Sequence, residues 1–332
     1  MGRYGPLLAD SGIPVHCLRL VSSRPSTYAR LGNLLRLIRS LAPDVIQGWM
    51  YHGNLAAWLA HKALDSKPRL AWNIRHSLYD PKLEPLRTRM AIESGKHLSG
   101  APRVILYNSH VSRVLHERWG FCPRHGHVIP NGFDVSRDDA IDVASMRAAL
   151  GLPADAFVFG HFARDNPVKD HASFLKAATA IAARHSEVYF LAAGAGITAS
   201  NERLMANIPP SLSARIMLLG EREDVPALMR ICDAVVSSSY SEAFPNVLGE
   251  AMASGVPCIA TDVGDCAYLI GDTGLLVPPR DTVAMAAAMQ TMIDYPEQTR
   301  TWGKLARERV SANFSLHSVV EQYAALYNGE LV

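Results

Sequence analysis

The sequence is poor in the features that mark secreted, membrane-spanning or disulfide-linked proteins. It has five cysteines in 332 residues, an odd number without any C-x-x-C pair, which indicates reduced thiols in a cytoplasmic protein. It shows no apolar signal-peptide core, and no stretch approaches the roughly 18 uninterrupted apolar residues of a membrane-spanning helix. We therefore expect neither secretion nor membrane spanning, while attachment to a membrane surface stays open.

A strong excess of one charge is also missing. The chain carries 33 basic and 31 acidic residues, and its net charge of +2 provides no broad positive field for nucleic acid. The sequence has no D-x-D motif to hold a metal-bound diphosphate, and it has no internal repeat or low-complexity segment. With 48% hydrophobic residues, a chain of this length is expected to form two compact domains.

The sequence does contain a regular alternation of short β-branched runs with helical segments, the pattern of a doubly wound α/β protein. The second half predicts strands at Phe157–Phe162, Val188–Ala193, Arg215–Leu219, Ala234–Ser239, Pro257–Thr261 and Gly274–Val277, with helices near 170–184, 224–231, 246–254, 281–294 and 296–312. The first half predicts strands at Val15–Leu20, Val45–Trp49, Leu70–Ile74, Val104–Tyr107 and His127–Ile129, with helices near 27–41, 54–64, 83–98 and 110–118.

Each half therefore predicts a Rossmann-like domain. We place the first domain at 1–135, the second at 136–315 and a terminal helix at 316–332, with an irregular polar hinge over 133–156. Folds of this class bind their ligands at the carboxyl ends of the strands, so a cleft between the two sheets is the expected site.

Two glutamates separated by seven residues are the clearest functional signal. Glu242 follows the strand predicted at Ala234–Ser239, and Glu250 lies one to two turns into the next helix, with Pro245 expected in its first turn. A carboxylate can accept both hydroxyls of a vicinal diol, as on a sugar or a ribose. The structural alternative is that Glu242 caps the helix and Glu250 belongs to a solvated helix face.

Two cations follow the first strand of the second half. Arg164 and Lys169 occupy a strand-to-helix loop, at the edge of the sheet where the cleft is expected. Together they can neutralise a diphosphate, Arg164 through a planar fork and Lys169 as a point charge. The alternative is an ordinary solvated loop.

The sequence resembles the retaining GT-B glycosyltransferases of family 4. The resemblance is carried by Arg164 and Lys169, by Leu219–Val225, and by the run SEAFPNVLGEAMASGVP at Ser241–Pro257. The likeness covers nearly all of residues 128–329. It implies that Glu242 holds hydroxyls of the donor sugar, that Glu250 binds the ribose, and that Arg164 and Lys169 grip the diphosphate. It also implies donor-binding roles for Asn246 and Arg222.

The first half resembles the same family less specifically. The segment Trp72–Ser77 is similar to a strand whose terminal histidine faces the donor sugar, which makes His76 a catalytic candidate beside Glu242. His52 and Asn54 are similar to residues on the acceptor side. The terminal helix at 316–327 resembles a segment that crosses back to the first domain. The alternative for His76 is a histidine satisfied at a strand end.

The chain departs from the family pattern at its beginning. Members usually begin with a strand, a glycine-rich loop, a helix and a second strand. A segment like Gly5–Val15 follows these elements in the family, whereas this chain starts with that segment. We expect a truncated or misassigned start, with the first domain lacking its first strand and glycine-rich loop.

Two other patterns point elsewhere but are weak. Gly194–Ala199 fits G-x-G-x-x-A, yet it does not lie in the first βα unit of its domain, which argues against a dinucleotide. His116, Cys122, His125 and His127 are close in sequence but match no zinc spacing. No metal and no other cofactor is expected.

The resemblance implies a retaining glycosyltransferase that moves a hexose-type sugar from a nucleotide diphosphate-sugar to a saccharide or a polyprenyl- or other lipid-linked acceptor. The product would be a surface polysaccharide, lipopolysaccharide or glycolipid, made in the cytoplasm or at the inner face of the cytoplasmic membrane. The alternatives are a sugar-nucleotide epimerase or hydrolase, and a catalytically weak nucleotide-sugar-binding fragment.

Overall fold

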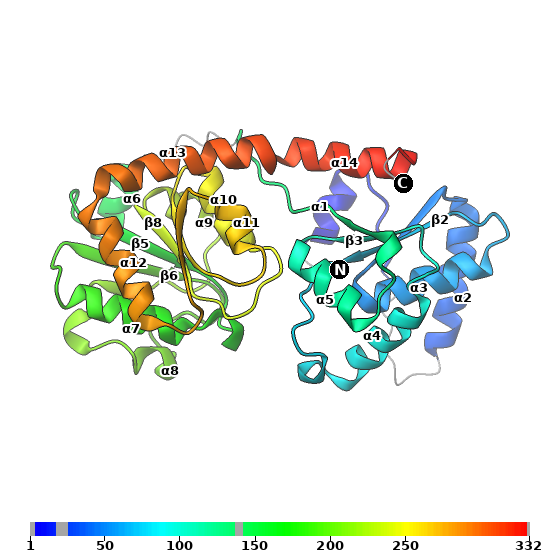
Figure 1. The fold of residues 1–332 in the computed structure, drawn as a ribbon, viewed down its shortest axis with the longest axis horizontal. Coiled ribbons are helices and arrows are strands. Elements are labelled where there is room, and N and C mark those ends of the chain that lie inside the picture. Colours follow the sequence, from blue (N-terminus) through cyan, green and yellow to red (C-terminus); the bar gives the residue numbers. More distant parts are fainter. Residues whose placement is uncertain (1–3, 18–25, 137–141, 331–332) are drawn as a thin grey trace.

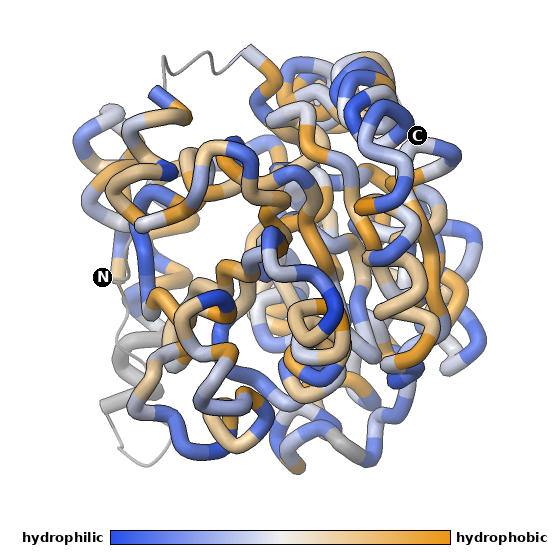
Figure 2. The backbone as a smooth tube through the Cα atoms, turned by 90° about the vertical axis from the view of Figure 1, so that its left-hand side faces the viewer, coloured by the Kyte–Doolittle hydropathy of each residue, from blue (hydrophilic) through white to orange (hydrophobic). Residues whose placement is uncertain are grey.

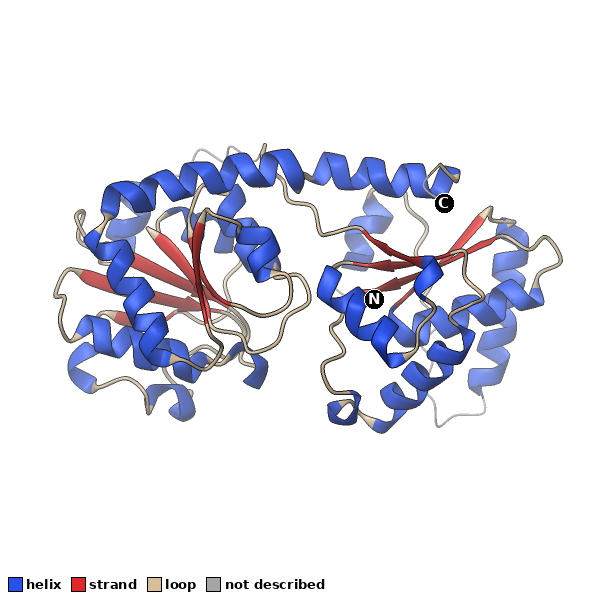
Figure 3. Cartoon of the chain, viewed as in Figure 1, coloured by secondary structure: helices blue, strands red, loops and turns tan. Residues whose placement is uncertain are grey.

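The computed structural model describes residues 4–17, 26–136 and 142–330, and they form two α/β lobes bridged by a long helical segment (Figure 1). Each lobe contains one all-parallel sheet with helices packed around it (Figure 3). The first sheet has the strand order β1-β2-β3-β4, and the second has the order β10-β9-β8-β5-β6-β7.

The first sheet is built from four short strands: β1 (Val45–Trp49), β2 (Arg69–Ile74), β3 (Val104–Tyr107) and β4 (Gly126–Val128). Its helices are α1 (Tyr4–Asp10), α2 (Ser26–Leu41), α3 (Met50–Ala63), α4 (Leu86–Leu98) and α5 (His110–Trp119). These four strands were predicted to within one residue at each end. The fifth prediction, a strand at Val15–Leu20, is wrong for Val15–Cys17, which pair with no strand and form no regular element; Leu18–Leu20 lie outside the described residues.

The second sheet has six strands: β5 (Phe157–Phe162), β6 (Val188–Ala193), β7 (Ile216–Leu218), β8 (Ala234–Ser237), β9 (Cys258–Thr261) and β10 (Gly274–Val277). The helices of this lobe are α6 (Val143–Ala149), α7 (His171–Ala182), α8 (Glu202–Met205), α9 (Val225–Arg230), α10 (Asn246–Ala253), α11 (Cys266–Ile270), α12 (Thr282–Asp294) and α13 (Pro296–Asn313). All six predicted strands are confirmed within two residues. The strands β5, β6, β8 and β9 are short, mostly apolar runs that are buried almost throughout, whereas β7 and β10 at the sheet edges are partly exposed.

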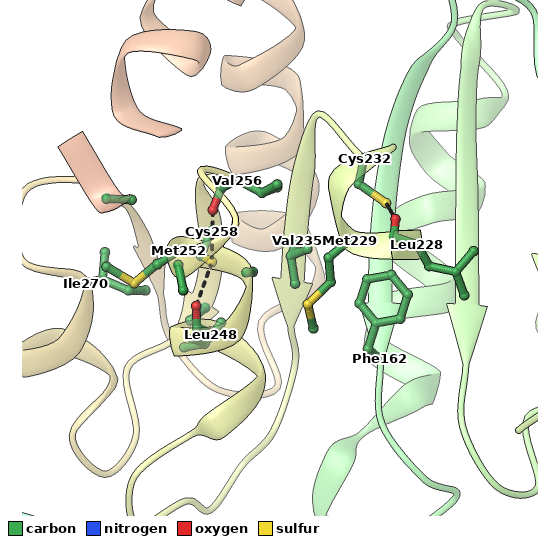
Figure 4. Packing of buried hydrophobic residues seen from close by; sticks show 14 of the residues in the cluster. Phe162, Leu228, Met229, Cys232, Val235, Leu248, Met252, Val256, Cys258 and Ile270 are labelled. Atoms are coloured by element: carbon green, nitrogen blue, oxygen red, sulfur yellow. Dashed lines mark hydrogen bonds between the residues drawn. The ribbon is translucent and has the colours of Figure 1, made fainter. Parts of the chain in front are cut away.

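Apolar packing on both faces of the second sheet fixes the position of its strand ends. One cluster joins β5 and β8 to α10 and includes three buried thiols, of which two are shown in Figure 4. Cys232 Sγ donates to the Leu228 carbonyl at 3.2 Å, so this thiol acts as a satisfied core residue (Figure 4). Coloured by hydropathy, the chain shows apolar stretches running through the interior of the lobes and hydrophilic stretches concentrated on the outside (Figure 2).

The chain crosses between the lobes twice, and the two crossings touch. The outgoing segment places Phe133 beside the end of α13, where its N–H donates to the Phe314 carbonyl at 2.9 Å and its carbonyl accepts from Leu316 N at 2.8 Å. Helix α14 (Leu316–Asn328) then lies on the first sheet, with Val319 and Leu326 buried against it. In Figure 1 α13 and α14 run along one side of both lobes.

Candidate active site

A pocket lies between the lobes at the carboxyl ends of both sheets, and each lobe contributes part of its wall. The first lobe supplies Arg75, His76, Ser77, Asn108 and Asn131, and the second supplies Arg164, Asn166, Val168, Lys169, Ser241, Glu242, Ala243, Phe244 and Asn246. Five residues singled out in the sequence therefore line one hollow: His76, Arg164, Lys169, Glu242 and Asn246.

Lys169 and Glu242 form an ion pair in this pocket, with 2.5 Å between Lys169 Nζ and Glu242 Oε1. Two further bonds tie their loops together, since Ser238 Oγ donates to the Lys169 carbonyl at 2.7 Å and Tyr240 N donates to the Val168 carbonyl at 3.0 Å. The Glu242 side chain is only 13% exposed, so the lysine compensates a largely desolvated carboxylate. Sequence reasoning gave the two residues separate roles and did not foresee this contact.

Arg164 is another cation of the pocket, which Lys169 and Arg75 also line, and its side chain is exposed. Among the described residues, no carboxylate or carbonyl is bonded to its guanidinium. The loop around it is fixed, because Asn166 caps the 3-10 turn Pro167–Lys169 and Asp170, at φ +45°, caps α7. A fixed backbone with an unengaged guanidinium and a nearby ammonium suits an anionic ligand.

His76 enters the pocket from the end of β2. Its Nδ1 lies 3.2 Å from the Tyr51 hydroxyl, and its Nε2 lies 3.4 Å from Glu84 Oε1. Partial burial lowers the pKa of His76, while the Glu84 carboxylate acts in the opposite direction. The ring is thus held at both nitrogens while the side chain stays 38% exposed.

Glu250 does not line the same hollow as Glu242. It lies farther along the cleft, in two adjoining hollows; one of them shares Arg75, Asn131 and Asn246 with the first pocket. The other contains Arg222, whose guanidinium makes bonds of 2.8 and 2.6 Å to the Asp224 carboxylate. The two glutamates therefore face different parts of one continuous cleft.

The walls around Glu250 raise its pKa by desolvation, although its side chain remains open to solvent in the cleft. The helix that carries it, α10, begins at Asn246. Pro245 is the residue before the helix, with φ −81° and ψ 101°, so the prediction that it lies in the first turn is wrong by one position. Gly249 is required where it is, because a Cβ there would lie 2.0 Å from the Phe133 ring.

The structure does not bring His52 and Asn54, the residues singled out for the acceptor side, into this pocket. Asn54 is buried in α3, and its side-chain amide bonds the backbone of Asn73 in β2 at 3.3 and 3.4 Å. It thereby joins α3 to the sheet. His52 is exposed on the same helix, which begins at Met50 and not near residue 54 as predicted.

Several residues that sequence reasoning missed hold the lobes together beside the pocket. Asp265 accepts from His110 N at 2.7 Å and from Val111 N at 3.0 Å, so a carboxylate of the second lobe caps α5 of the first. The Tyr79 hydroxyl accepts from Gly264 N at 2.9 Å. No local pattern reveals such bonds, because the partners are 155 and 185 residues apart in sequence.

The described residues contain no group of three or more histidine, cysteine, aspartate or glutamate side chains that could hold a metal ion. His116, singled out among four neighbouring histidines and cysteines, bonds instead to Tyr51 and the Ser112 carbonyl. Within the described ranges, no helix has both the length and the hydropathy needed to cross a bilayer.

Comparisons with known proteins match both halves of the chain. The family model described as Glycosyl transferases group 1 matches residues 155–295, and the model described as Glycosyltransferase Family 4 matches residues 3–137. A region of 115 residues is 38% identical to N-acetyl-alpha-D-glucosaminyl L-malate synthase of Bacillus anthracis, covering 34% of this chain and 30% of that protein. The chain thus spans about a third of that relative's length.

Two further comparisons extend over most of the chain. The lipopolysaccharide core biosynthesis mannosyltransferase LpcC of Rhizobium leguminosarum is 27% identical over 345 residues, covering 92% of this chain and 96% of that protein. The crystal structure of HepE from Anabaena in complex with UDP superposes with a TM-score of 0.85 at 24% identity, covering 99% of this chain and 90% of that one. With one family model on each half and this two-lobed architecture, the chain belongs to the family 4, or group 1, glycosyltransferases and has the GT-B fold.

Proposed function

We propose that the protein is a retaining glycosyltransferase that moves a hexose-type sugar from a nucleotide diphosphate-sugar to a saccharide or lipid-linked acceptor. The observation that carries this proposal is the pocket between the lobes, where Arg164 and the Lys169–Glu242 pair lie opposite His76. The pocket offers cations that can bind a diphosphate beside a carboxylate that can bind sugar hydroxyls. The diphosphate and the sugar are the two groups joined by the bond to be broken.

In this proposal Arg164 and Lys169 bind the donor diphosphate, and their charge stabilises it as it departs. No D-x-D motif is present to recruit a metal to the diphosphate, so these two side chains supply the positive charge and the reaction is metal-independent. When the diphosphate enters, Lys169 is shared between it and Glu242, and the second carboxylate oxygen of Glu242 accepts sugar hydroxyls. Glu242 is therefore both a sugar ligand and the group that positions Lys169.

The nucleoside end of the donor lies along the cleft toward Glu250. Asn246 borders both the sugar pocket and the next hollow, and it accepts a hydrogen bond from Asn131 of the first lobe, so it lies where the two parts of the ligand meet. Glu250 accepts from the ribose hydroxyls, and Arg222 borders the far hollow.

Retention of configuration is supported by the carboxylates of the pocket. Among the described residues that line it, Glu242 is the only acidic one, and Lys169 already holds it. Within the part of the chain that the structure describes, no second carboxylate lines this pocket to act as a covalent nucleophile, so in this proposal the acceptor hydroxyl itself attacks, on the face from which the diphosphate leaves. His76 contacts the sugar or the attacking hydroxyl.

The names of the compared proteins support the substrate class. Solved complexes of HepE contain UDP and UDP-glucose, and LpcC is named a mannosyltransferase of lipopolysaccharide core synthesis. We infer a glycan of the cell surface as the product. The free cysteines support a cytoplasmic location, where a lipid-linked acceptor would be met at the inner membrane face.

The test is a panel of UDP- and GDP-hexoses incubated with the full chain and a set of saccharide and lipid-linked acceptors, with EDTA present in a parallel series. We expect acceptor-dependent release of the nucleoside diphosphate, unaffected by EDTA, and a product whose anomeric configuration by NMR matches the donor. Donor consumption without acceptor would favour a hydrolase, an altered sugar without release an epimerase, and binding without turnover a nucleotide-sugar-binding fragment. An inverted product would overturn the retaining assignment.

A further inference from the structure

A chain of hydrogen-bonding side chains leads from the pocket into the interior of the first lobe. His116 is fully buried in α5, with the rings of Phe121 and Tyr107 at 5.1 and 5.5 Å from its own. Its Nδ1 lies 2.7 Å from the Ser112 carbonyl, and its Nε2 lies 2.8 Å from the hydroxyl of Tyr51, which is 4% exposed. The same hydroxyl reaches His76 Nδ1 at 3.2 Å.

The direction of each bond follows from the carbonyl at the buried end. A carbonyl oxygen only accepts, so His116 Nδ1 carries a proton and donates it to the bond with Ser112. Burial lowers the pKa of His116 to about 4, so its Nε2 has no proton at neutral pH and accepts from Tyr51. Burial also raises the pKa of Tyr51, which keeps its proton. Because the Tyr51 hydroxyl donates its one proton to His116, its oxygen can only accept in the bond with His76. His76 Nδ1 is therefore the donor of that bond.

We propose that Tyr51 and His116 are positioning residues that hold the neutral His76 ring in its Nδ1–H tautomer, leaving Nε2 as a hydrogen-bond acceptor at the pocket. The catalytic role of this tautomer rests on the proposed function, in which His76 forms a hydrogen bond with a hydroxyl of the sugar or of the acceptor. Which ring nitrogen carries the proton is set by the partner of the other nitrogen, and here that partner is fixed through two buried side chains.

The tautomer matters because the outer partner alone would select the opposite one. Glu84 Oε1, 3.4 Å from Nε2, is a carboxylate and would bond to an Nε2–H. The Tyr51–His116 chain opposes this choice. Nε2 therefore keeps its lone pair toward an incoming hydroxyl, and Glu84 stabilises the ring when Nε2 takes up a proton.

The test is a measurement of His76 tautomer by long-range ¹H–¹⁵N NMR on the donor-free, full chain at neutral pH, with the signal assigned by its loss in His76→Asn. We expect Nδ1–H in the wild type. In His116→Phe the Tyr51 hydroxyl has lost its acceptor and can donate to His76 Nδ1, so the tautomer should reverse to Nε2–H. His97→Gln, which removes an exposed histidine of α4, is the matched control and should leave the signal unchanged.

The same variants are then compared in transfer assays. With His116→Phe we expect kcat to fall roughly 10²-fold, the scale of a correctly placed proton, while the dissociation constant of the nucleoside diphosphate is unchanged. Tyr51→Phe removes the acceptor of the His76 Nδ1–H group, so it should also shift the ring toward the Nε2–H tautomer. This variant replaces His116→Phe in the test if His116→Phe does not fold. An Nε2–H tautomer in the wild type, or a reversed tautomer with normal kcat, would overturn the inference. Absence of transfer in the wild type would instead overturn the proposed function, and the tautomer, measured without donor, would still be decided.

Discussion

The two lobes share one architecture but use their polar residues differently. The second lobe has six strands and two large apolar clusters, and its pocket residues stand on loops tied to one another, as Lys169 is to Glu242. The first lobe has four described strands, and its edge strand β1 is only partly buried. Buried side-chain polar atoms without a protein partner, within the described ranges, all belong to the first lobe, among them Ser77 Oγ and Asn108 Oδ1 at the pocket.

This difference indicates a division of labour. Paired charges in the second lobe form a preorganised receptor for a charged ligand, which suits the donor. In the first lobe, the neutral ring of His76, held by Tyr51 and backed by His116, is 38% exposed at the pocket and suits a neutral polyol that brings its own donors and acceptors. The following variants test whether the two lobes can be separated in this way.

The largest effect is expected from Lys169→Ala. The variant removes a diphosphate ligand and leaves the carboxylate of Glu242 without its partner at 2.5 Å. We expect turnover to fall by roughly 10²–10³-fold, the usual cost of losing one donor that stabilises developing charge. Lys176→Ala, an exposed lysine on α7, is the control and should retain activity. Equal activity of the two variants would remove Lys169 from the site.

A smaller effect is expected at the bond between the lobes. Asp265→Ala deprives two N–H groups of α5 of their acceptor, and we expect a loss of about 1–2 kcal/mol of unfolding free energy together with a larger radius of gyration in solution. Asp281→Ala removes a cap that lies within one lobe, where Ala284 N donates to Asp281 at 2.8 Å. It should lower thermal stability similarly but leave the radius unchanged. An unchanged radius in both variants would show that the Asp265 contact does not hold the lobes together.

The smallest effect concerns the ribose end. Because surrounding walls raise the pKa of Glu250, this group takes up a proton at a higher pH than an ordinary glutamate. Ribose hydroxyls need the ionised carboxylate, so donor affinity should decrease as the pH falls through that raised pKa. Glu250→Gln should weaken donor binding about 10-fold at higher pH and abolish this pH dependence in calorimetric titrations. Glu202→Gln, on α8, is the control; the same pH profile in both variants would contradict the assignment.

The sequence predicted the second lobe better than the first for physical reasons. Four of its six strands, β5, β6, β8 and β9, are mostly apolar and buried almost throughout. The loops that carry Arg164, Lys169 and Glu242 follow two of the strand ends, those of β5 and β8, so local pattern was sufficient to group them. The hydrogen-bonded group of Tyr51, His76 and His116 in the first lobe brings together α3, the segment after β2 and α5, so its members form no local motif. The bonds between Asn54 and the Asn73 backbone are likewise tertiary contacts, which the local sequence pattern does not predict.

The most direct test of the donor receptor is the rate of sugar transfer by Glu242→Gln, measured with the donor and acceptor found in the substrate panel. Glutamine keeps the shape of the side chain but removes the charge that holds Lys169 and accepts sugar hydroxyls. We predict that transfer falls by at least roughly 10²-fold while nucleoside diphosphate binding is preserved, because Arg164 and Lys169 remain. Transfer at the wild-type rate would contradict the account of this pocket as the place where the donor sugar is held.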